Sequence, residues 1–219
     1  MELIDAVRRR RMTRNFSGKP LERGAVDDLL EAALRAPSAG NSEGREFVVL
    51  EGDETARYWD STTDAEWRAS SPRFAGLRRA PTVVLAFADP DAYVARYAEP
   101  DKAVVTQDVA GWPVPFWFVD AGFSVMTILL GAVDRGVGAA FLGNFRGEAA
   151  LRAELGVPDR LRWLGAVLLG EAAEPDPPTT SARRPRRSLE ECVHRGGWRA
   201  GAEGSGTDRT LLAPGGPPG

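Results

Sequence analysis

Residues 82–88 read Thr-Val-Val-Leu-Ala-Phe-Ala, a run of seven residues without a charged side chain. Such a run, rich in β-branched residues, predicts a buried strand. Shorter apolar runs predict three more strands, at residues 47–50, 140–142 and 164–169. The strands are few and apolar, so the sheet that they form is expected to be small.

Helical patterns lie between these strands. The apolar residues of 22–35 recur at i, i+3, i+4, i+7 and i+8, which predicts an amphipathic helix. Residues 2–11, 116–135 and 147–155 are interpreted as further helices, and the second of these is apolar enough to be buried. Helices that interleave with a few apolar strands predict an α+β or α/β sandwich, with helices on both faces of the sheet.

Four stretches show weaker patterns. Residues 52–80 predict one more helix, and residues 89–115 predict a long loop-rich excursion of the kind that often forms a lid or a binding loop. The basic stretch 183–198 is expected to be extended or briefly helical. One domain is therefore predicted over residues 1–198, followed by a disordered tail rich in glycine and proline at 199–219.

The composition limits the function. The 219 residues are 43% hydrophobic and 27% charged with a net charge of -3, which is typical of a globular domain and argues against nucleic-acid or membrane partners. The run 116–133 is interrupted by Asp120 and two glycines, so a buried helix is favoured over a membrane span. Cys192 is the only cysteine, which favours a reducing, cytoplasmic setting.

Most catalytic motifs are absent from the sequence. His194 is the only histidine, so neither a zinc or iron site nor a serine triad is expected. The chain has no G-x-x-x-x-G-K-[ST] loop and no dinucleotide fingerprint. If the protein is an enzyme, its reactive group is therefore expected to come from a cofactor.

Two segments in the N-terminal part could bind a ligand. Residues 8–16 read RRRRMTRNF, and the planar fork of arginine suits a phosphate. By itself this segment is equally typical of a solvated basic face or a nucleic-acid patch. Residues 36–41 read APSAGN; small residues let the backbone approach a flat ligand, and Asn41 offers a donor and an acceptor. By itself this is an ordinary turn.

Two later segments could complete the site. Residues 136–145 read GVGAAFLGNF, where glycines permit close backbone contact with a ligand. Residues 183–191 read RRPRRSLEE, a second basic stretch that could converge with the first on one anion. A plain turn and a basic tail remain the alternatives for these two segments.

In this order the four segments resemble the flavin mononucleotide (FMN)-dependent nitroreductase family, over about residues 3–198. The family pattern is R-R-S-x-R-x-F, A-P-S-x-x-N-x-Q-P-W, a late G-L-G, and a basic segment leading to P-L-E-E. Here these read RRMTRNF, APSAGNSEGREF, GVGAAFLGNF and RRSLEECVHRGGW. Residues 98–117 are similar to an actinobacterial branch of the family. The resemblance implies an α/β/α sandwich with a small, mostly antiparallel sheet, and a homodimer wrapped by its C-terminal segments.

The resemblance also implies roles for individual residues. Residues of the first and last segments would bind the FMN phosphate, namely Arg10, Arg11, Met12, Arg184, Arg186 and Arg187. Arg14 would lie near the ribityl chain or the pyrimidine edge, and Gly143 and Asn144 near N5 and O4. The turn would contact the flavin of the partner subunit through Pro37, Ser38, Ala39 and Asn41. Trp112, Phe116 and Trp117 are candidates for an aromatic wall over the substrate, or for core or dimer packing.

Two departures from the family pattern stand out. Met12 replaces the usual serine, which removes a hydroxyl donor to the phosphate. Glu43, Gly44 and Arg45 replace the usual Gln-Pro-Trp, and a carboxylate cannot donate as glutamine does. An altered pocket, altered nucleotide use or weaker FMN binding is expected from these changes.

The function implied by the resemblance is ping-pong redox chemistry. NADH or NADPH would deliver a hydride to flavin N5 and leave, and an electron-poor acceptor such as a nitroaromatic or a quinone would then be reduced. The alternatives are flavin fragmentation, dehydrogenation, a non-enzymatic flavin store, and a basic-arm nucleic-acid binder. The sequence has no short motif that chooses the nucleotide or the acceptor.

Overall fold

The computed structural model describes residues 1–198 except 72, 103–107, 144 and 145, so the predicted tail at 199–219 lies outside the described residues. The chain divides into two compact units, Met1–Asp176 and Pro177–Gly219. The first unit contains the sheet and the helices that pack on it. The described part of the second contains α9 (Leu189–Cys192), which begins with a capping box between Ser188 and Glu191.

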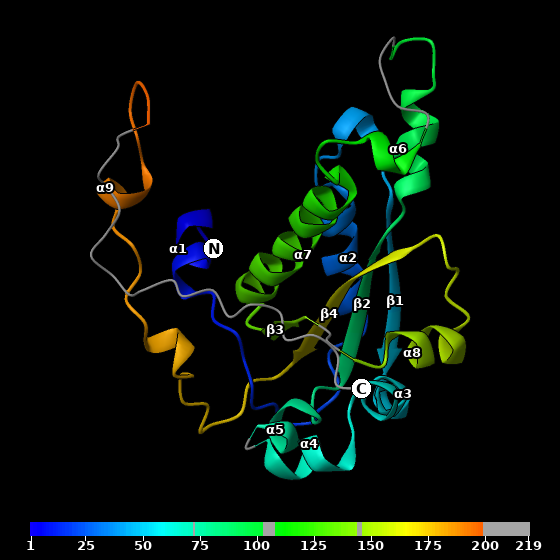
Figure 1. Cartoon of the computed structure of the whole chain (residues 1–219). Helices are drawn as coiled ribbons and strands as arrows, with labels where there is room; N and C mark the ends of the chain where they lie inside the picture. Colours follow the sequence, from blue (N-terminus) through cyan, green and yellow to red (C-terminus); the bar gives the residue numbers. More distant parts are fainter. Residues whose placement is uncertain (72, 103–107, 144–145, 199–219) are drawn as a thin grey trace, which may run out of the picture. The chain divides into compact units, whose positions relative to one another are not determined.

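A four-stranded antiparallel sheet lies at the centre of the first unit (Figure 1). Its strands are β1 (Arg45–Glu51), β2 (Thr82–Ala88), β3 (Gly138–Leu142) and β4 (Arg162–Gly170), in the order β1-β2-β4-β3. All seven residues of β2 are buried, which confirms the predicted central strand. Val83, Leu85 and Phe87 pack in one core, whereas Val84 and Ala86 pack in another on the opposite face.

Helices cover both faces of this sheet. The second core contains α2 (Ala25–Leu34) and α7 (Phe116–Asp134), through side chains such as Leu29 and Ile128. The first core contains α3 (Thr55–Thr62) and α8 (Glu148–Leu155), through side chains such as Trp59 and Leu151. The predicted α+β sandwich is thereby confirmed.

Helix α7 is long and apolar enough, by length and composition, to cross a membrane. Its inner side chains Ile128 and Leu129 are buried in the core against the sheet, and it packs along α2. The predicted buried helix is therefore a core helix of the sandwich.

The sequence prediction was wrong in two connecting segments. Residues 52–80 form three helices, α3, α4 (Ala65–Ser70) and α5 (Phe74–Leu77), where one was expected. The expected loop at 89–115 begins instead with α6 (Pro90–Tyr97), which starts because the Asp89 carboxylate accepts from Asp91 N at 3.1 Å and Pro90 suits a first turn.

The buried side chain of Tyr58 is expected to make the fold less stable at alkaline pH. Burial raises the pKa of Tyr58 to about 12. The raised pKa means that the folded chain holds the proton more tightly than the unfolded chain, so the associated stability is complete below about pH 10 and is lost as the pH rises through about 12. Two pKa units correspond to roughly 3 kcal/mol.

We therefore expect the free energy of unfolding to fall on going from about pH 9 to about pH 12, and Tyr58→Phe to remove roughly 2–3 kcal/mol of that fall. Urea titrations of both proteins at the two pH values measure it. An equal alkaline loss in Tyr58→Phe contradicts the prediction.

Candidate functional site

The arginine-rich segment lies along the outer edge of the sheet. This segment is residues 8–16, and helix α1 (Leu3–Arg9) ends at its second arginine. Thr13 N donates to the carbonyl of Ala139 at 2.8 Å, and Phe141 N donates to the sulfur of Met12 at 3.3 Å. Edge strands present backbone groups that need partners. Residues 12 and 13 supply these partners, which attaches this part of the segment to β3.

Arg10 is the best-prepared phosphate ligand in this segment. Its side chain is half-buried, and its Nη1 is buried without a hydrogen-bond partner among the residues that the structure describes. A buried N–H without an acceptor costs free energy. A phosphate oxygen is a strong acceptor for a guanidinium, so the site fits the phosphate of FMN.

Arg11 differs from Arg10 although both were predicted to bind the phosphate. Arg11 is exposed, and its Nη2 lies 3.3 Å from Oε1 of Glu174. A phosphate would compete with this carboxylate for Arg11, so we expect Arg11 to contribute less than Arg10.

Arg14 is held by its own segment. Its Nη1 donates to the carbonyl of Met12 at 2.9 Å, and its backbone N donates to Asp176 Oδ2 at 3.0 Å. Burial and the nearby positive charge of Arg73 lower the pKa of Arg14, and Asp176 opposes this. Two like charges held close together favour an anionic group beside them. Arg73 was missed by sequence reasoning because it lies in the weakly patterned stretch 52–80.

Met12, which replaces the serine of the family pattern, has a structural role. Its side chain packs against both hydrophobic cores while its sulfur accepts from Phe141 N. Truncating a fully buried methionine lowers the free energy of unfolding by about 2–5 kcal/mol. Because Met12 is half-buried, Met12→Ser is expected to lower it by roughly 1–2 kcal/mol. The restored hydroxyl should keep or increase FMN affinity. Thermal unfolding and FMN titration measure the two effects, and a loss of FMN affinity contradicts this assignment.

The turn at residues 37–42 is fixed by several hydrogen bonds. In η1 (Ala39–Asn41), Ala39 N donates to Asp120 Oδ2 at 2.8 Å, and Arg96 Nε donates to the Gly40 carbonyl at 2.8 Å. Glu43 N donates to Ser38 Oγ at 3.0 Å. Of the four residues predicted to meet a flavin, Pro37 and Asn41 are exposed, whereas Ser38 and Ala39 are half-buried.

The stretch Glu43-Gly44-Arg45, which replaces the family's Gln-Pro-Trp, has a structural role through Arg45. The Arg45 side chain is 5% exposed; its Nη1 donates to the Ala36 carbonyl at 3.0 Å and its Nη2 to the Leu34 carbonyl. Leu34 is the last residue of α2, whose C-terminal end a cation stabilises, and Ala36 lies two residues beyond it. Arg45 thus anchors the residues just before the turn.

The three predicted substrate residues lie in one aromatic cluster. The ring of Trp112 is 6.2 Å from that of Phe116 and 6.1 Å from that of Trp117. Tyr93 and Tyr97 complete the cluster around Trp112. Trp117 is buried, whereas Trp112 and Phe116 are half-buried and can still meet a ligand.

The structure describes the surroundings of the remaining predicted residues only in part. Gly143 follows β3, is exposed, and has open space where a side chain would project, while Asn144 lies outside the described residues. Arg184, Arg186 and Arg187 belong to the second unit and are exposed there. Their contact with the FMN phosphate stays a prediction.

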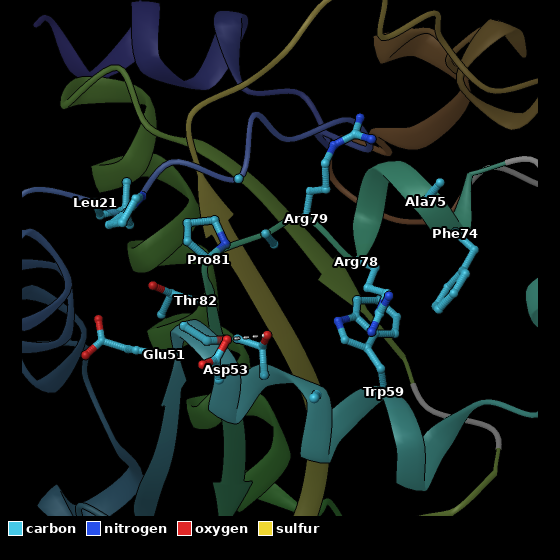
Figure 2. A pocket seen from close by; sticks show the side chains of 16 residues that line it. Leu21, Glu51, Asp53, Trp59, Phe74, Ala75, Arg78, Arg79, Pro81 and Thr82 are labelled. Atoms are coloured by element: carbon cyan, nitrogen blue, oxygen red, sulfur yellow. Dashed lines mark hydrogen bonds between the residues drawn. The ribbon is translucent and has the colours of Figure 1, made fainter.

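A cavity of about 680 Å³ opens beside the start of α3 (Figure 2). Its walls include Leu21, Asp53, Trp59 and Phe74, and it shares no residue with the predicted cofactor or substrate sets. Figure 2 shows the Arg79 side chain pointing away from the other lining residues; its Nε donates to the Phe16 carbonyl at 2.8 Å. The cavity therefore borders the end of the segment 8–16 at Phe16 but contains none of the predicted cofactor residues.

The arginine-rich edge and the turn lie at opposite ends of α7. Asp120, near the start of this helix, bonds to the turn, whereas Asp134, at its end, forms an ion pair with the amino group of Met1. A rise of about 1.5 Å per residue separates these positions by roughly 20 Å. The two ends of α7 therefore contact different segments of the chain.

Comparison with known proteins agrees with this fold. A sequence model described as the nitroreductase family matches residues 7–171. The chain belongs to the nitroreductase family.

Relatives of this nitroreductase-family chain carry redox names. It is 29% identical over 218 residues to a 4-nitrobenzoate reductase of a Nocardioides species, covering 84% of this chain and 87% of the relative. It is 25% identical over 173 residues to an Archaeoglobus fulgidus protein named as an NADH dehydrogenase/NAD(P)H nitroreductase, covering 77% and 84% of the two chains.

Solved structures share the nitroreductase fold. A Desulfovibrio desulfuricans protein named as a nitroreductase, solved in complex with FMN, superposes with a TM-score of 0.65 at 24% identity, over 91% of this chain and 99% of that one. A nitroreductase family protein of Clostridium difficile superposes with a TM-score of 0.68 at 19% identity, over 90% and 100%. The predicted family and fold are thereby confirmed, whereas the roles of individual residues stay predictions.

Proposed function

We propose that this nitroreductase-family chain binds FMN and uses NADH or NADPH to reduce electron-poor acceptors such as nitroaromatics or quinones. The observation that carries the proposal is the buried Arg10 Nη1, which has no acceptor in the described part of the chain. The names of the relatives and the FMN bound by the Desulfovibrio desulfuricans protein support the same conclusion.

Arg10 and Arg11 would hold the FMN phosphate, with help from Arg186 or Arg187 and, more weakly, Arg184. Arg10 supplies a buried donor that lacks an acceptor among the described residues, so the phosphate would satisfy it without displacing another partner. Arg11 would exchange an exposed carboxylate partner for the phosphate. The thioether of Met12 would add packing but no hydrogen bond to the phosphate.

The redox end of the cofactor would lie near Arg14 and Gly143. When bound, FMN supplies the chemistry, because it takes a hydride from NAD(P)H and passes it to the acceptor. The positive charges of Arg14 and Arg73 favour negative charge on the ligand edge beside them. Gly143 leaves space for a flat ring, and Asn144 would complete this side.

Aromatic side chains would orient the acceptor. Trp112 and Phe116 are half-buried and lie in one cluster with Trp117. Flat electron-poor rings stack favourably on such side chains. This arrangement supports nitroaromatics and quinones as the acceptor class.

We further propose that the chain works as a homodimer. The outer face of α7 exposes Val119, Phe123 and Met126, and α1 exposes Leu3, Ile4 and Val7. These residues recur at helical spacing, and an exposed apolar stripe marks an interaction surface. A second copy would cover them and bring its own turn at residues 37–41 to the arginine-rich edge. The contacts of the two ends of α7 with different segments of one chain support a second copy as the occupant.

Three further expectations complete the proposal. Residues 1–198 would form the working domain, and the segment from residue 177 onward would wrap the partner subunit. The protein would act in the cytoplasm, without a nucleic-acid or membrane partner.

Anaerobic half-reactions test this function. We expect NADH or NADPH to bleach the flavin absorption of the purified protein, and a nitroaromatic or quinone added afterwards to restore it. Comparing the two nucleotides at equal concentration identifies the preferred reductant. A flavin that neither nucleotide reduces overturns the proposal, as does a reduced flavin that no electron-poor acceptor reoxidises.

A further inference from the structure

A buried carboxylate holds the turn that the proposed function places against the flavin. Asp120 lies in the first half of α7 and is 4% exposed. Its Oδ2 accepts from Ala39 N at 2.8 Å and from the Tyr93 hydroxyl at 2.7 Å. Both donors lie on other elements, so Asp120 joins α7, α6 and the turn at a single atom.

The surroundings of Asp120 keep both hydrogen bonds in place. Burial and the hydrogen bond to Asp120 raise the pKa of Tyr93 well above its ordinary value, and the positive charge of Arg45 opposes this. Tyr93 therefore keeps its proton and donates to Asp120 throughout the neutral range. The guanidinium of Arg45 therefore lies close enough to Tyr93 for its charge to act on that side chain.

Gly44 and Arg45, which replace residues of the family motif, pack in the same region as Tyr93. A Cβ at Gly44 would lie 2.6 Å from Tyr93 Cε2 and 2.6 Å from the Asp89 carbonyl oxygen, so only glycine lets Tyr93 approach. Arg45 follows at once and anchors Ala36. Glycine and arginine at these two positions therefore form one packed unit with Tyr93 and Asp120 beneath the turn.

A buried charge is expensive unless its hydrogen bonds are made. The groups that Asp120 binds are a tyrosine and a backbone amide of the turn, and none of the chemistry described above needs its carboxylate. Arg96 Nε donates to the carbonyl of Gly40, the residue after Ala39, at 2.8 Å. Two hydrogen bonds, from Ala39 N to Asp120 and from Arg96 to the Gly40 carbonyl, therefore fix the backbone of the turn. A surface that binds a rigid ligand requires such a fixed backbone.

The geometry points to Asp120 as a positioning residue, which fixes the Ala39 amide and so sets residues 38–41 in the conformation that contacts the flavin of the partner subunit. This inference rests on the proposed function. Asp120 acts through the turn and does not itself touch the cofactor.

Asp120→Asn and Tyr93→Phe test the inference, because both preserve shape. The first replaces a charged acceptor by a neutral one, and the second removes one of the two donors. Ser124→Ala is the matched control: Ser124 is 0% exposed on the same helix, and its hydroxyl bonds to the Asp120 backbone carbonyl and not to the turn. Two quantities are measured, namely hydrogen exchange of the Ala39 amide in the cofactor-free protein and the Kd for FMN.

We expect about tenfold faster Ala39 exchange and about tenfold weaker FMN binding in Asp120→Asn, since a charge-assisted hydrogen bond is roughly twice as strong as a neutral one. Tyr93→Phe should show the same pattern to a smaller degree, and Ser124→Ala should match the wild type in both. Unchanged exchange and unchanged FMN affinity in Asp120→Asn overturn the inference, as do equal effects in Ser124→Ala. If the wild type binds no FMN, the proposed function fails, and the exchange measurement still decides whether Asp120 fixes the turn.

Discussion

Replacing Arg10 by methionine is expected to weaken FMN binding by roughly 10- to 150-fold, because hydrogen bonds to charged groups contribute about 1.5–3 kcal/mol. Methionine keeps an apolar stem of similar length and removes only the guanidinium. The stability of the cofactor-free protein should not fall, because the lost Nη1 has no acceptor among the described residues. Fluorescence titration with FMN and thermal unfolding without FMN measure the two effects.

The neighbouring arginines provide the controls for Arg10→Met. Arg9→Met alters an exposed side chain outside the predicted set and should leave the Kd for FMN unchanged. Arg11→Met should cause a smaller loss, because Arg11 already pairs with Glu174. Equal losses at Arg9 and Arg10 would indicate a general charge effect. An unchanged Kd in Arg10→Met means that the phosphate assignment is wrong.

Phe123→Asp is expected to convert the protein into a monomer that does not retain FMN. Phe123 is 47% exposed between Val119 and Met126 on the outer face of α7. Dimerisation would bury the new carboxylate without a partner, at a cost of roughly 3–5 kcal/mol or at least about a 100-fold weaker association. FMN binding should be lost as well, because the turn at residues 37–41 would no longer reach the flavin of the other subunit.

Light scattering during gel filtration, combined with FMN titration, measures both effects of Phe123→Asp. Phe123→Leu keeps an apolar side chain at the same position and should remain dimeric and yellow. A wild type that runs as a monomer argues against the shared site. So does a Phe123→Asp variant that is monomeric and binds FMN with wild-type affinity.

The central elements were predictable because their patterns are strong. The seven uncharged residues 82–88 form β2 over the predicted range, and the apolar run from Phe116 forms α7 to within one residue of the predicted end. Strong hydrophobic periodicity reflects burial, and burial is what the fold requires of these segments. The order of the four motifs was enough to identify the family.

The weaker helices were missed for identifiable reasons. Helices α4 and α5 are six and four residues long, too short to show a clear period. Helix α6 had a readable start signal, because Asp89 precedes Pro90 at a helix N-terminus. The aromatic and proline residues that follow concealed it.

The supporting residues of the site were the least predictable. Asp120 was noticed only as an interruption of an apolar run, although a carboxylate in a buried helix requires a partner. Its partners, Ala39 and Tyr93, are 81 and 27 residues away in the chain, and only the fold brings them together. Arg45 was noted as a departure from the family motif, but its role at the end of α2 follows only from the structure.

The visible absorption spectrum of the purified protein, recorded before and after incubation with FMN and gel filtration, tests the central claim most directly. The account predicts a yellow protein with the bands of bound flavin and one FMN per chain. It also predicts that Arg10→Met loses this colour during gel filtration while Arg9→Met keeps it. A folded wild-type protein that stays colourless after incubation with FMN would contradict the account.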